Sequence, residues 1–496
     1  MTAWSHGYNV SVEYKSFGFY REMAPDWLDF CVRSAGYETV RRSNAFRYLY
    51  LGSGQGFGLC VLAAANPEAE FVGVDFQPEH IAHAQGLAEA AGLSNVRFVQ
   101  ADFADLAAAW PEDLGTFDYV ALHGVLSWIS TRLRGLVTQC LFHATHAGSL
   151  VYTGYNAQPG WIGTMPFQHL SRLIYETDKP PEAVLKESTS LFDRLAAANA
   201  PIFRILPALK AHVDAVRSRD PTYFAHEYLT ESWHPLWHSE LSREFRRAEL
   251  DYVASATLAD SLLPDILQAP LREAIAGQPN DDLREDVQDF VINQAFRRDI
   301  FCRGAGRRSS SDLRNNGQTF LYLVPSLEPG VPVNFRTSFG EVAMAYRIFG
   351  PFVEALANGP KTVDELMQIP NRTEMKTEHA LPLLLHATIL GVGAAEPGPV
   401  EASQRLNAVT ARAASAGAPY KALAATMLGS GVTATEIDLM LVDSWLESNG
   451  AADARALAKG VSQRMTGAES GKDVEALANA FVAQTLPRYR QLGVLE

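Results

Sequence analysis

The sequence has few cysteines and no paired arrangement of them. The four cysteines among 496 residues lie far apart, at Cys31, Cys60, Cys140 and Cys302, and no CxxC pair occurs. This spacing argues against a disulfide framework and against a cysteine-rich zinc site, because both need clustered thiols. We therefore expect reduced, buried thiols, as in a cytoplasmic protein.

Basic residues are outnumbered by acidic ones. Asp and Glu number 56, Lys and Arg 42, the formal net charge is −14, and no long run of Lys or Arg occurs. An extended nucleic-acid-binding groove is therefore disfavoured, since such grooves carry clustered positive charge. We expect no nucleic-acid partner.

Long uninterrupted apolar runs are absent. Residues 1–20 have neither the basic nor the apolar region of a signal peptide. The most apolar stretch, residues 46–75, contains several glycines and is flanked by charges, so that no membrane span is expected. We predict a soluble, cytoplasmic protein whose length corresponds to about two to four domains.

The stretch 46–75 predicts a strand, a glycine turn, a helix and a second strand that ends at Asp75. The turn contains Gly52, Gly54, Gly56 and Gly58. Glycines allow positive φ and let a ligand approach bare backbone. An acid about 20 residues after such a turn can accept hydrogen bonds from a ribose diol. The alternative is a tight turn that binds no ligand.

The glycine spacing excludes two familiar phosphate-binding loops. The dinucleotide fingerprint G-x-G-x-x-G/A fails in both registers, because Phe57 and Leu59 stand where Gly or Ala is required. A P-loop needs Gly-Lys followed by Ser or Thr, and no lysine is nearby. The pattern instead resembles motif I of the class I methyltransferases that use S-adenosyl-L-methionine (SAM).

Further predicted strands bring polar residues to the same edge of the sheet. These strands cover residues 95–100, 117–122 and 149–154. Asp102 follows the first and His123 follows the second. Because parallel strands end at one edge, we expect both residues near the glycine turn. In a methyltransferase-like sheet Asp102 faces the adenine amino group, and it can also cap the next helix.

Six separated motifs carry a more specific resemblance. They are LGSGQGFG, GVDFQPEHI, HGVLSWIS, YNAQPGW, HEYL and NQAFRRDIF, in this order. Together they resemble the methyltransferases with a methyltransferase regulatory domain, a family that includes rickettsial protein-lysine methyltransferases of outer-membrane proteins. The resemblance covers roughly residues 8–306. It implies a Rossmann-like α/β fold with a mostly parallel, seven-stranded sheet, SAM as cofactor, and a protein substrate such as an outer-membrane or surface protein before export. The sequence leaves open whether the protein forms a homodimer.

The resemblance also implies a cofactor site, with Asp75 at the ribose and Asp102 at the adenine. By this resemblance its members are Gly52, Gly54, Gly56, Asp75 and Asp102. We further expect Phe76, Phe103 and His123 there, and Tyr14 and Tyr20 either close the pocket or pack against the sheet. One position departs from the family, whose members usually carry Glu or Asp two positions before the first glycine. This chain has Tyr50 there.

Methyl transfer from a sulfonium is a direct displacement, so the protein contributes alignment and exclusion of water. A lysine acceptor must first lose a proton, because its ordinary pKa is about 10.4. His123 is the candidate base near neutral pH. The candidates on the acceptor side are His123, Trp128, Tyr155, Asn156 and Trp161, each of which could instead serve packing or turns. No metal site is expected, because the helically spaced histidines lack a third ligand.

Breakers and composition divide the chain. We expect a SAM-binding core at 1–156, a helical insertion at 157–247, and the end of the core at 248–306, where 250–256 and 298–303 form an antiparallel pair. A linker or hinge at 307–318 is expected to follow. Beyond it we expect a winged-helix-like accessory domain at 319–400, with a hairpin of 320–324 and 331–337, and an α-rich, helical C-terminal region at 401–496. Three functions compete: protein-lysine methyltransferase, small-molecule methyltransferase, and non-catalytic SAM-binding or scaffold protein.

Overall fold

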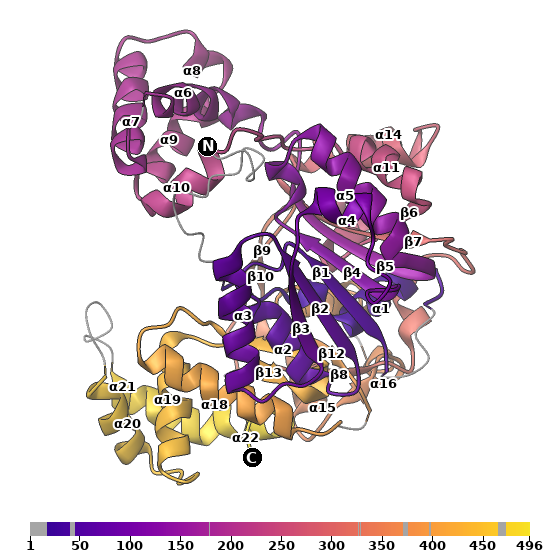
Figure 1. Ribbon diagram of the computed structural model, residues 1–496. Helices are drawn as coiled ribbons and strands as arrows, with labels where there is room; N and C mark the ends of the chain where they lie inside the picture. The colour runs from indigo at the N-terminus through magenta and orange to yellow at the C-terminus, as the bar shows by residue number, and fades with distance from the viewer. Residues whose placement is uncertain are drawn as a thin grey trace.

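A seven-stranded sheet forms the centre of the molecule (Figure 1), with the strand order β3-β2-β1-β4-β5-β7-β6. This computed structural model describes residues 17–39, 45–177, 179–325, 327, 329–370, 375–395, 398–464 and 473–496. The strands are β1 (Arg47–Leu51), β2 (Glu70–Asp75), β3 (Val96–Gln100), β4 (Phe117–His123), β5 (Thr145–Asn156), β6 (Leu250–Ser255) and β7 (Phe296–Arg303). Neighbours among β1 to β5 are parallel, whereas β7 is antiparallel to β5 and β6. The predicted Rossmann-like α/β sheet is confirmed.

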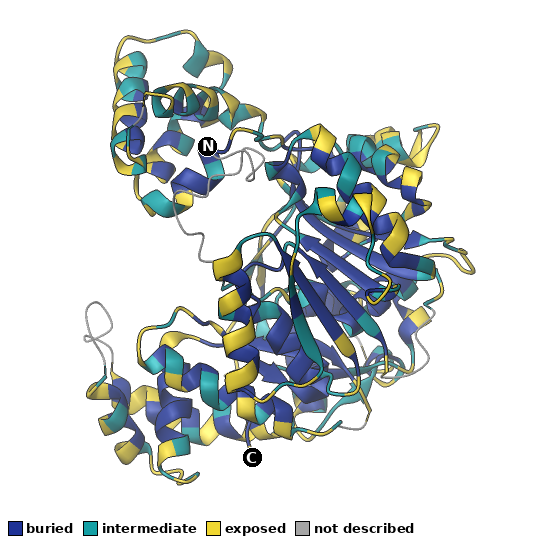
Figure 2. Cartoon of the chain, in the orientation of Figure 1, coloured by how far each residue is buried: buried dark blue, intermediate teal, exposed yellow. Residues whose placement is uncertain are grey.

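Both faces of the sheet are covered by helices, as a parallel sheet requires. On β1, Tyr48 and Tyr50 belong to the core on one face, while Leu49 and Leu51 belong to the core on the other. The first face packs against α1 (Pro25–Ser34), α2 (Phe57–Ala65) and α3 (Pro78–Ala90), and the second against α4 (Phe103–Ala108), α5 (Thr131–Ala144) and α11 (His238–Phe245). Figure 2 shows the central strands buried and α3 exposed along its outer side.

The helical insertion follows β5 and has a small core of its own. It contains α6 (Met165–Tyr175), α7 (Pro181–Ala197), α8 (Ile202–Ile205), α9 (Ala208–Arg217) and α10 (Pro221–Tyr228). Phe167, Phe192, Val213 and Phe224 are buried together in this core. In Figure 1 the insertion stands as a separate lobe beside the sheet.

Between β6 and β7 the chain forms a further group of helices. These are α12 (Leu263–Ile266), α13 (Ala269–Ala276) and α14 (Asp281–Ile292). The two segments predicted from the sequence as an antiparallel pair fall on β6 and β7.

The segment 307–318 is fixed to the core, which differs from the hinge that its composition predicts. The backbone N–H of Asp312 donates to the carbonyl of Ser34 at 2.9 Å. Asn316 is buried, and its side-chain amide donates to the carbonyl of Phe30 at 3.0 Å. These contacts bind the segment along α1.

The hairpin predicted from 320–324 and 331–337 is wrong. β8 (Phe320–Leu323) instead lies between β11 (Lys361–Thr362) and β12 (Leu390–Gly393). β9 (Val333–Thr337) pairs with β10 (Gly340–Met344) across a two-residue turn. The local pairing closes a shorter loop, and β8, buried along most of its length, gains partners on both sides.

Three helices accompany this small sheet: α15 (Tyr346–Leu356), α16 (Val363–Met367) and α17 (Thr377–His386). Thr362 begins α16 with a capping box, in which its hydroxyl and the Glu365 carboxylate each accept a bond from the other residue's backbone N–H. The winged-helix-like description of this region stays a prediction.

The C-terminal region is mostly helical, but it also contains a hairpin that composition did not predict. The helices are α18 (Glu401–Ser415), α19 (Glu436–Glu447), α20 (Ala454–Ser462), α21 (Val474–Ala480) and α22 (Leu486–Gln491), and the hairpin joins β13 (Ala422–Ala425) to β14 (Ser430–Thr433). Alanine favours helices in isolation, whereas here burial decides: all of β13 is buried.

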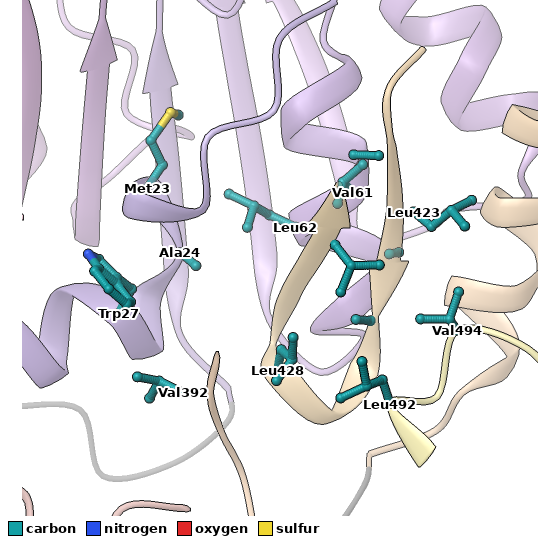
Figure 3. Packing of buried hydrophobic residues seen from close by; sticks show 14 of the residues in the cluster. Met23, Ala24, Trp27, Val61, Leu62, Val392, Leu423, Leu428, Leu492 and Val494 are labelled. Atoms are coloured by element: carbon teal, nitrogen blue, oxygen red, sulfur yellow. The ribbon is translucent and has the colours of Figure 1, made fainter. Parts of the chain in front are cut away.

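The hairpin covers α2 on the side away from the sheet. Every residue of α2 except Gly58 is buried, and a helix that is apolar on all sides needs cover on all sides. Figure 3 shows Val61 and Leu62 of α2 beside the hairpin that carries Leu423 and Leu428. The accessory region therefore completes the core of the sheet domain.

Within the described residues, no helix has both the length and the apolar character that crossing a bilayer requires. Nor does the described part of the chain contain a cluster of side chains suited to a metal ion. All four cysteines are free and buried.

Candidate active site

A cavity of about 330 Å³ lies at the carboxyl edge of the parallel strands. Its wall comes from the ends of β1, β2, β4 and β5, from the residues that follow β3, and from α10 of the insertion. Ligands bind at this edge in open parallel sheets. The topology therefore brings most of the predicted cofactor residues to one place, namely Tyr20, Gly52, Gly54, Asp75, Phe76, Asp102, Phe103 and His123.

The glycine turn forms one wall through Gly52 and Gly54, with φ of +74° and +55°. A Cβ atom on Gly52 would lie 2.6 Å from Cγ2 of Val125, so the backbone approaches its neighbour too closely for any side chain. Gly56 lies outside the cavity wall. Its added Cβ would lie 2.4 Å from Cβ of Ala84, which indicates that Gly56 lets α2 pack closely against α3.

Asp75 joins the glycine turn to the start of α3. Its Oδ2 accepts a hydrogen bond from the Gly54 N–H at 2.9 Å, and its Oδ1 accepts from the Gln77 N–H at 3.0 Å. Nδ1 of His80 lies 3.2 Å from the same Oδ1. The carboxylate lines the cavity with 7% of the residue exposed, so it is oriented before any ligand binds.

Asp102 lines the next part of the wall and also caps α4. Its Oδ1 accepts a hydrogen bond from the Ala104 N–H at 2.7 Å. Phe76 and Phe103, which directly follow the two acids, line the cavity as well. An acid beside aromatic rings suits a flat base with an exocyclic amino group.

Two buried polar atoms of the wall have no hydrogen-bond partner within the described part of the chain. They are Oγ of Ser53 and Nε2 of His80, and both residues line the cavity. Buried polar atoms are almost always hydrogen-bonded, so a polar ligand is expected to contact them. The glycine turn, the oriented Asp75 and these two atoms fit the nucleoside and amino-acid parts of SAM.

His123 lies between two aromatic rings. Its ring stacks on Tyr20 with 3.7 Å between centroids, and its Nδ1 lies 2.9 Å from the hydroxyl of Tyr152. Burial, aided by the charge of Arg298, lowers the pKa of His123 to about 3. The ring is therefore neutral and weakly basic near pH 7, which disfavours the predicted role as general base.

Tyr20, Tyr50, Trp128 and Asn156 all line the cavity. The backbone N–H of Asn156 donates to Oγ of Ser127 at 2.9 Å. This bond fixes the end of β5, from which the Asn156 side chain reaches the cavity.

The structure does not bring every predicted site residue to the cavity. The hydroxyl of Tyr155 donates to Oδ2 of Asp299 at 2.6 Å, and the residue is fully buried between strands. The indole of Trp161 donates to the carbonyl of Ala295 at 2.8 Å, which ties the start of the insertion to the loop before β7. Tyr14 lies outside the described residues.

Sequence reasoning missed the contribution of the insertion. Tyr223, His226 and Glu227 of α10 line the cavity. Burial raises the pKa of Glu227 to about 7, and the hydrogen bond from Asn156 and the charge of Arg219 lower it in part. The motif HEYL at 226–229 was the available signal, but it indicated a family and no position in space.

Two family models match parts of the chain. Residues 42–152 match a model described as a methyltransferase domain. Residues 220–303 match a model described as a predicted methyltransferase regulatory domain, which spans α10 and the strands β6 and β7. Both matched segments contribute residues to the cavity wall.

The chain is also similar to whole proteins. An uncharacterised protein of Synechocystis is 28% identical over 510 residues, which cover 99% of each chain. An uncharacterised protein of Rickettsia prowazekii is 27% identical over 263 residues, which cover 52% of this chain and 46% of the relative. Two structures of PKMT2 from Rickettsia typhi, one in complex with AdoHcy, superpose with a TM-score of 0.69. They cover 97% of this chain and 99% of theirs at 14% and 16% identity. At this identity the likeness shows a shared fold.

Proposed function

We propose that this chain, a SAM-dependent methyltransferase with a methyltransferase regulatory domain, methylates lysine side chains of another protein. The observation that carries the proposal is the group of aromatic rings in the cavity wall. Separate segments of the chain contribute them: Tyr20, Trp128, Tyr223 and Phe296.

Such a wall suits a long, narrow amine. The faces of the aromatic rings attract the lysine side chain in its ammonium form. The low polarity of the cavity then favours loss of a proton, which gives the neutral amine that methyl transfer requires. Bound SAM would supply a methyl group on a positively charged sulfur. Gly52, Gly54, Asp75 and Asp102 would hold it, which leaves the aromatic rings for the acceptor.

Three further observations support a protein as the acceptor. The insertion adds a lobe next to the cavity, beyond what binding a cofactor needs. The whole chain shares its fold with PKMT2, accessory regions included. The sequence motifs resemble those of rickettsial protein-lysine methyltransferases. We further propose that the acceptor is a surface protein methylated in the cytoplasm before export.

Mass spectrometry tests the acceptor class. The full chain is incubated with SAM and candidate surface proteins, and lysine peptides are searched for added methyl groups. Gly52→Val, whose side chain would collide with Val125, serves as the cofactor-site control, and Gly163→Val, with open space around it, serves as its match. We expect methylated lysines with the wild type and the Gly163 variant alone. Transfer to small hydroxyl or carboxyl compounds, with none to protein, would contradict the proposal.

A further inference from the structure

Helix α10 presents two different faces. Asp220 caps its first turn by accepting a hydrogen bond from the Thr222 N–H at 2.7 Å, and Pro221 stands at its first position. Phe224 and Tyr228 point into the core of the insertion. The face made by Tyr223, His226 and Glu227, at positions i, i+3 and i+4, lines the cavity.

Glu227 is the acid on this face. Asn156 of β5 donates to its Oε1 at 3.3 Å, so the carboxylate is positioned from the sheet side of the cavity. Arg219 is close enough for its charge to lower the pKa of Glu227 in part. Tyr223 and Tyr228 of the same helix are close enough to interact electrostatically with it.

We propose that Glu227 receives the acceptor lysine: its carboxylate pairs with the lysine ammonium in the aromatic part of the cavity and accepts a proton from it before methyl transfer. This role rests on the proposed function. Tyr20, Tyr223 and Trp128 would surround the methylene chain of the lysine, and Asn156 acts as the positioning residue for the carboxylate.

The step balances in protons and electrons. The lysine ammonium gives one proton to the Glu227 carboxylate, which leaves a neutral amine and a neutral carboxylic acid. The amine nitrogen then forms a bond to the methyl carbon, and the electron pair of the broken carbon–sulfur bond stays on the sulfur. Glu227 finally releases its proton to solvent, so that one proton is lost for each methyl transferred.

The charge of Glu227 predicts the pH dependence. Burial raises its pKa to about 7, against the hydrogen bond from Asn156 and the charge of Arg219. The carboxylate is therefore neutral below this pH and ionised above it. Tyr223 and His123, which also line the cavity, stay uncharged in this range, because burial raises the pKa of Tyr223 to about 12 and lowers the pKa of His123 to about 3. The charge of Arg219 favours the ionised form of Glu227. Acceptor binding and rate are expected to rise together through pH 7.

Glu227→Gln tests the proposal, because it removes the charge and keeps the shape. The exposed Glu231, which follows α10, supplies the matched control Glu231→Gln. Binding of n-butylamine, a mimic of the lysine end, is measured by calorimetry with the full chain saturated with S-adenosylhomocysteine. We expect at least tenfold weaker binding in Glu227→Gln at pH 8, equal S-adenosylhomocysteine affinity in all variants, and no change in Glu231→Gln.

Kinetics on a lysine peptide found by the methylation assay give the second measurement. kcat/KM of the wild type should rise through pH 7. In Glu227→Gln this rise with pH should disappear and the rate should fall about 10²–10⁴-fold. Glu227→Asp should restore the rise with pH at a lower rate, and it serves as the test if the Gln variant folds poorly. If Glu227→Gln binds n-butylamine and methylates the peptide as the wild type does, the role of Glu227 is overturned and the proposed function stays intact. Absence of lysine methylation by the wild type would overturn both.

Discussion

At the scale of single residues, Asp75 has two tasks, because its carboxylate faces the cavity while it accepts N–H bonds from Gly54 and Gln77. Asp75→Ala should therefore lower SAM affinity at least about tenfold and also reduce the free energy of unfolding by about 1–3 kcal/mol for each donor left without a partner. Asp75→Asn keeps one acceptor oxygen and should retain more stability. Calorimetry and urea unfolding measure the two effects; an Ala variant as stable as the wild type would remove the structural task.

Tyr50 lines the cavity two positions before the first glycine, where the family that the motifs resemble usually carries an acid, and it is 8% exposed. A carboxylate at this position would attract the ammonium of the cofactor's amino-acid part, which a phenol does only weakly. Tyr50→Glu is expected to bind SAM several-fold more tightly by calorimetry. Tyr50→Gln, whose side chain has the length of glutamate but no charge, should not bind SAM more tightly than the wild type. Weaker binding in the Glu variant would mean that the phenol makes a contact of its own with the cofactor or with the wall.

At the scale of elements, the contact between α2 and the β13-β14 hairpin leaves no room for a side chain at Gly431. A Cβ atom there would lie 2.7 Å from Cγ1 of Val61 and 2.9 Å from the carbonyl oxygen of Leu423. Gly431→Ala should reduce the free energy of unfolding by about 1–3 kcal/mol, because the packed hairpin must shift.

Gly135 inside α5 supplies the opposite control, since no atom lies within 4 Å of its added Cβ. Gly135→Ala should raise the free energy of unfolding by about 0.5–1 kcal/mol through helix propensity alone. Denaturant unfolding of both variants checks the pair. Equal effects at the two glycines would show that the hairpin does not pack tightly on α2.

At the scale of the whole molecule, the sheet domain and the accessory region share one core. Val61 of α2 packs on the hairpin, and Asn316 binds α1 from beyond the sheet. A chain that ends at Gly306 would expose the buried side of α2 to water. We expect such a chain to aggregate and to regain SAM binding only when 307–496 is co-expressed. A soluble 1–306 fragment that binds SAM as the full chain does would contradict this.

Much of the fold follows from local patterns. The apolar runs that become β1 to β5, the positive-φ glycines and the acids after β2 and β3 are all encoded in short segments. Because parallel strands end at one edge, the sequence alone places their tips at one cavity. Asp75, Asp102 and His123 could therefore be predicted as its wall.

Contacts between distant segments decided the rest. Tyr155 and Asn156 are neighbours at the end of β5, yet only Asn156 faces the cavity, because side chains alternate across a strand. Glu227 reaches the same cavity only because the insertion folds back on its own core. The hairpin β13-β14 forms within an alanine-rich region because α2 must be covered on both sides. Local periodicity determines which elements form and which of their faces are apolar. The partner that buries each face depends on segments far away in the sequence, and only the tertiary structure selects it.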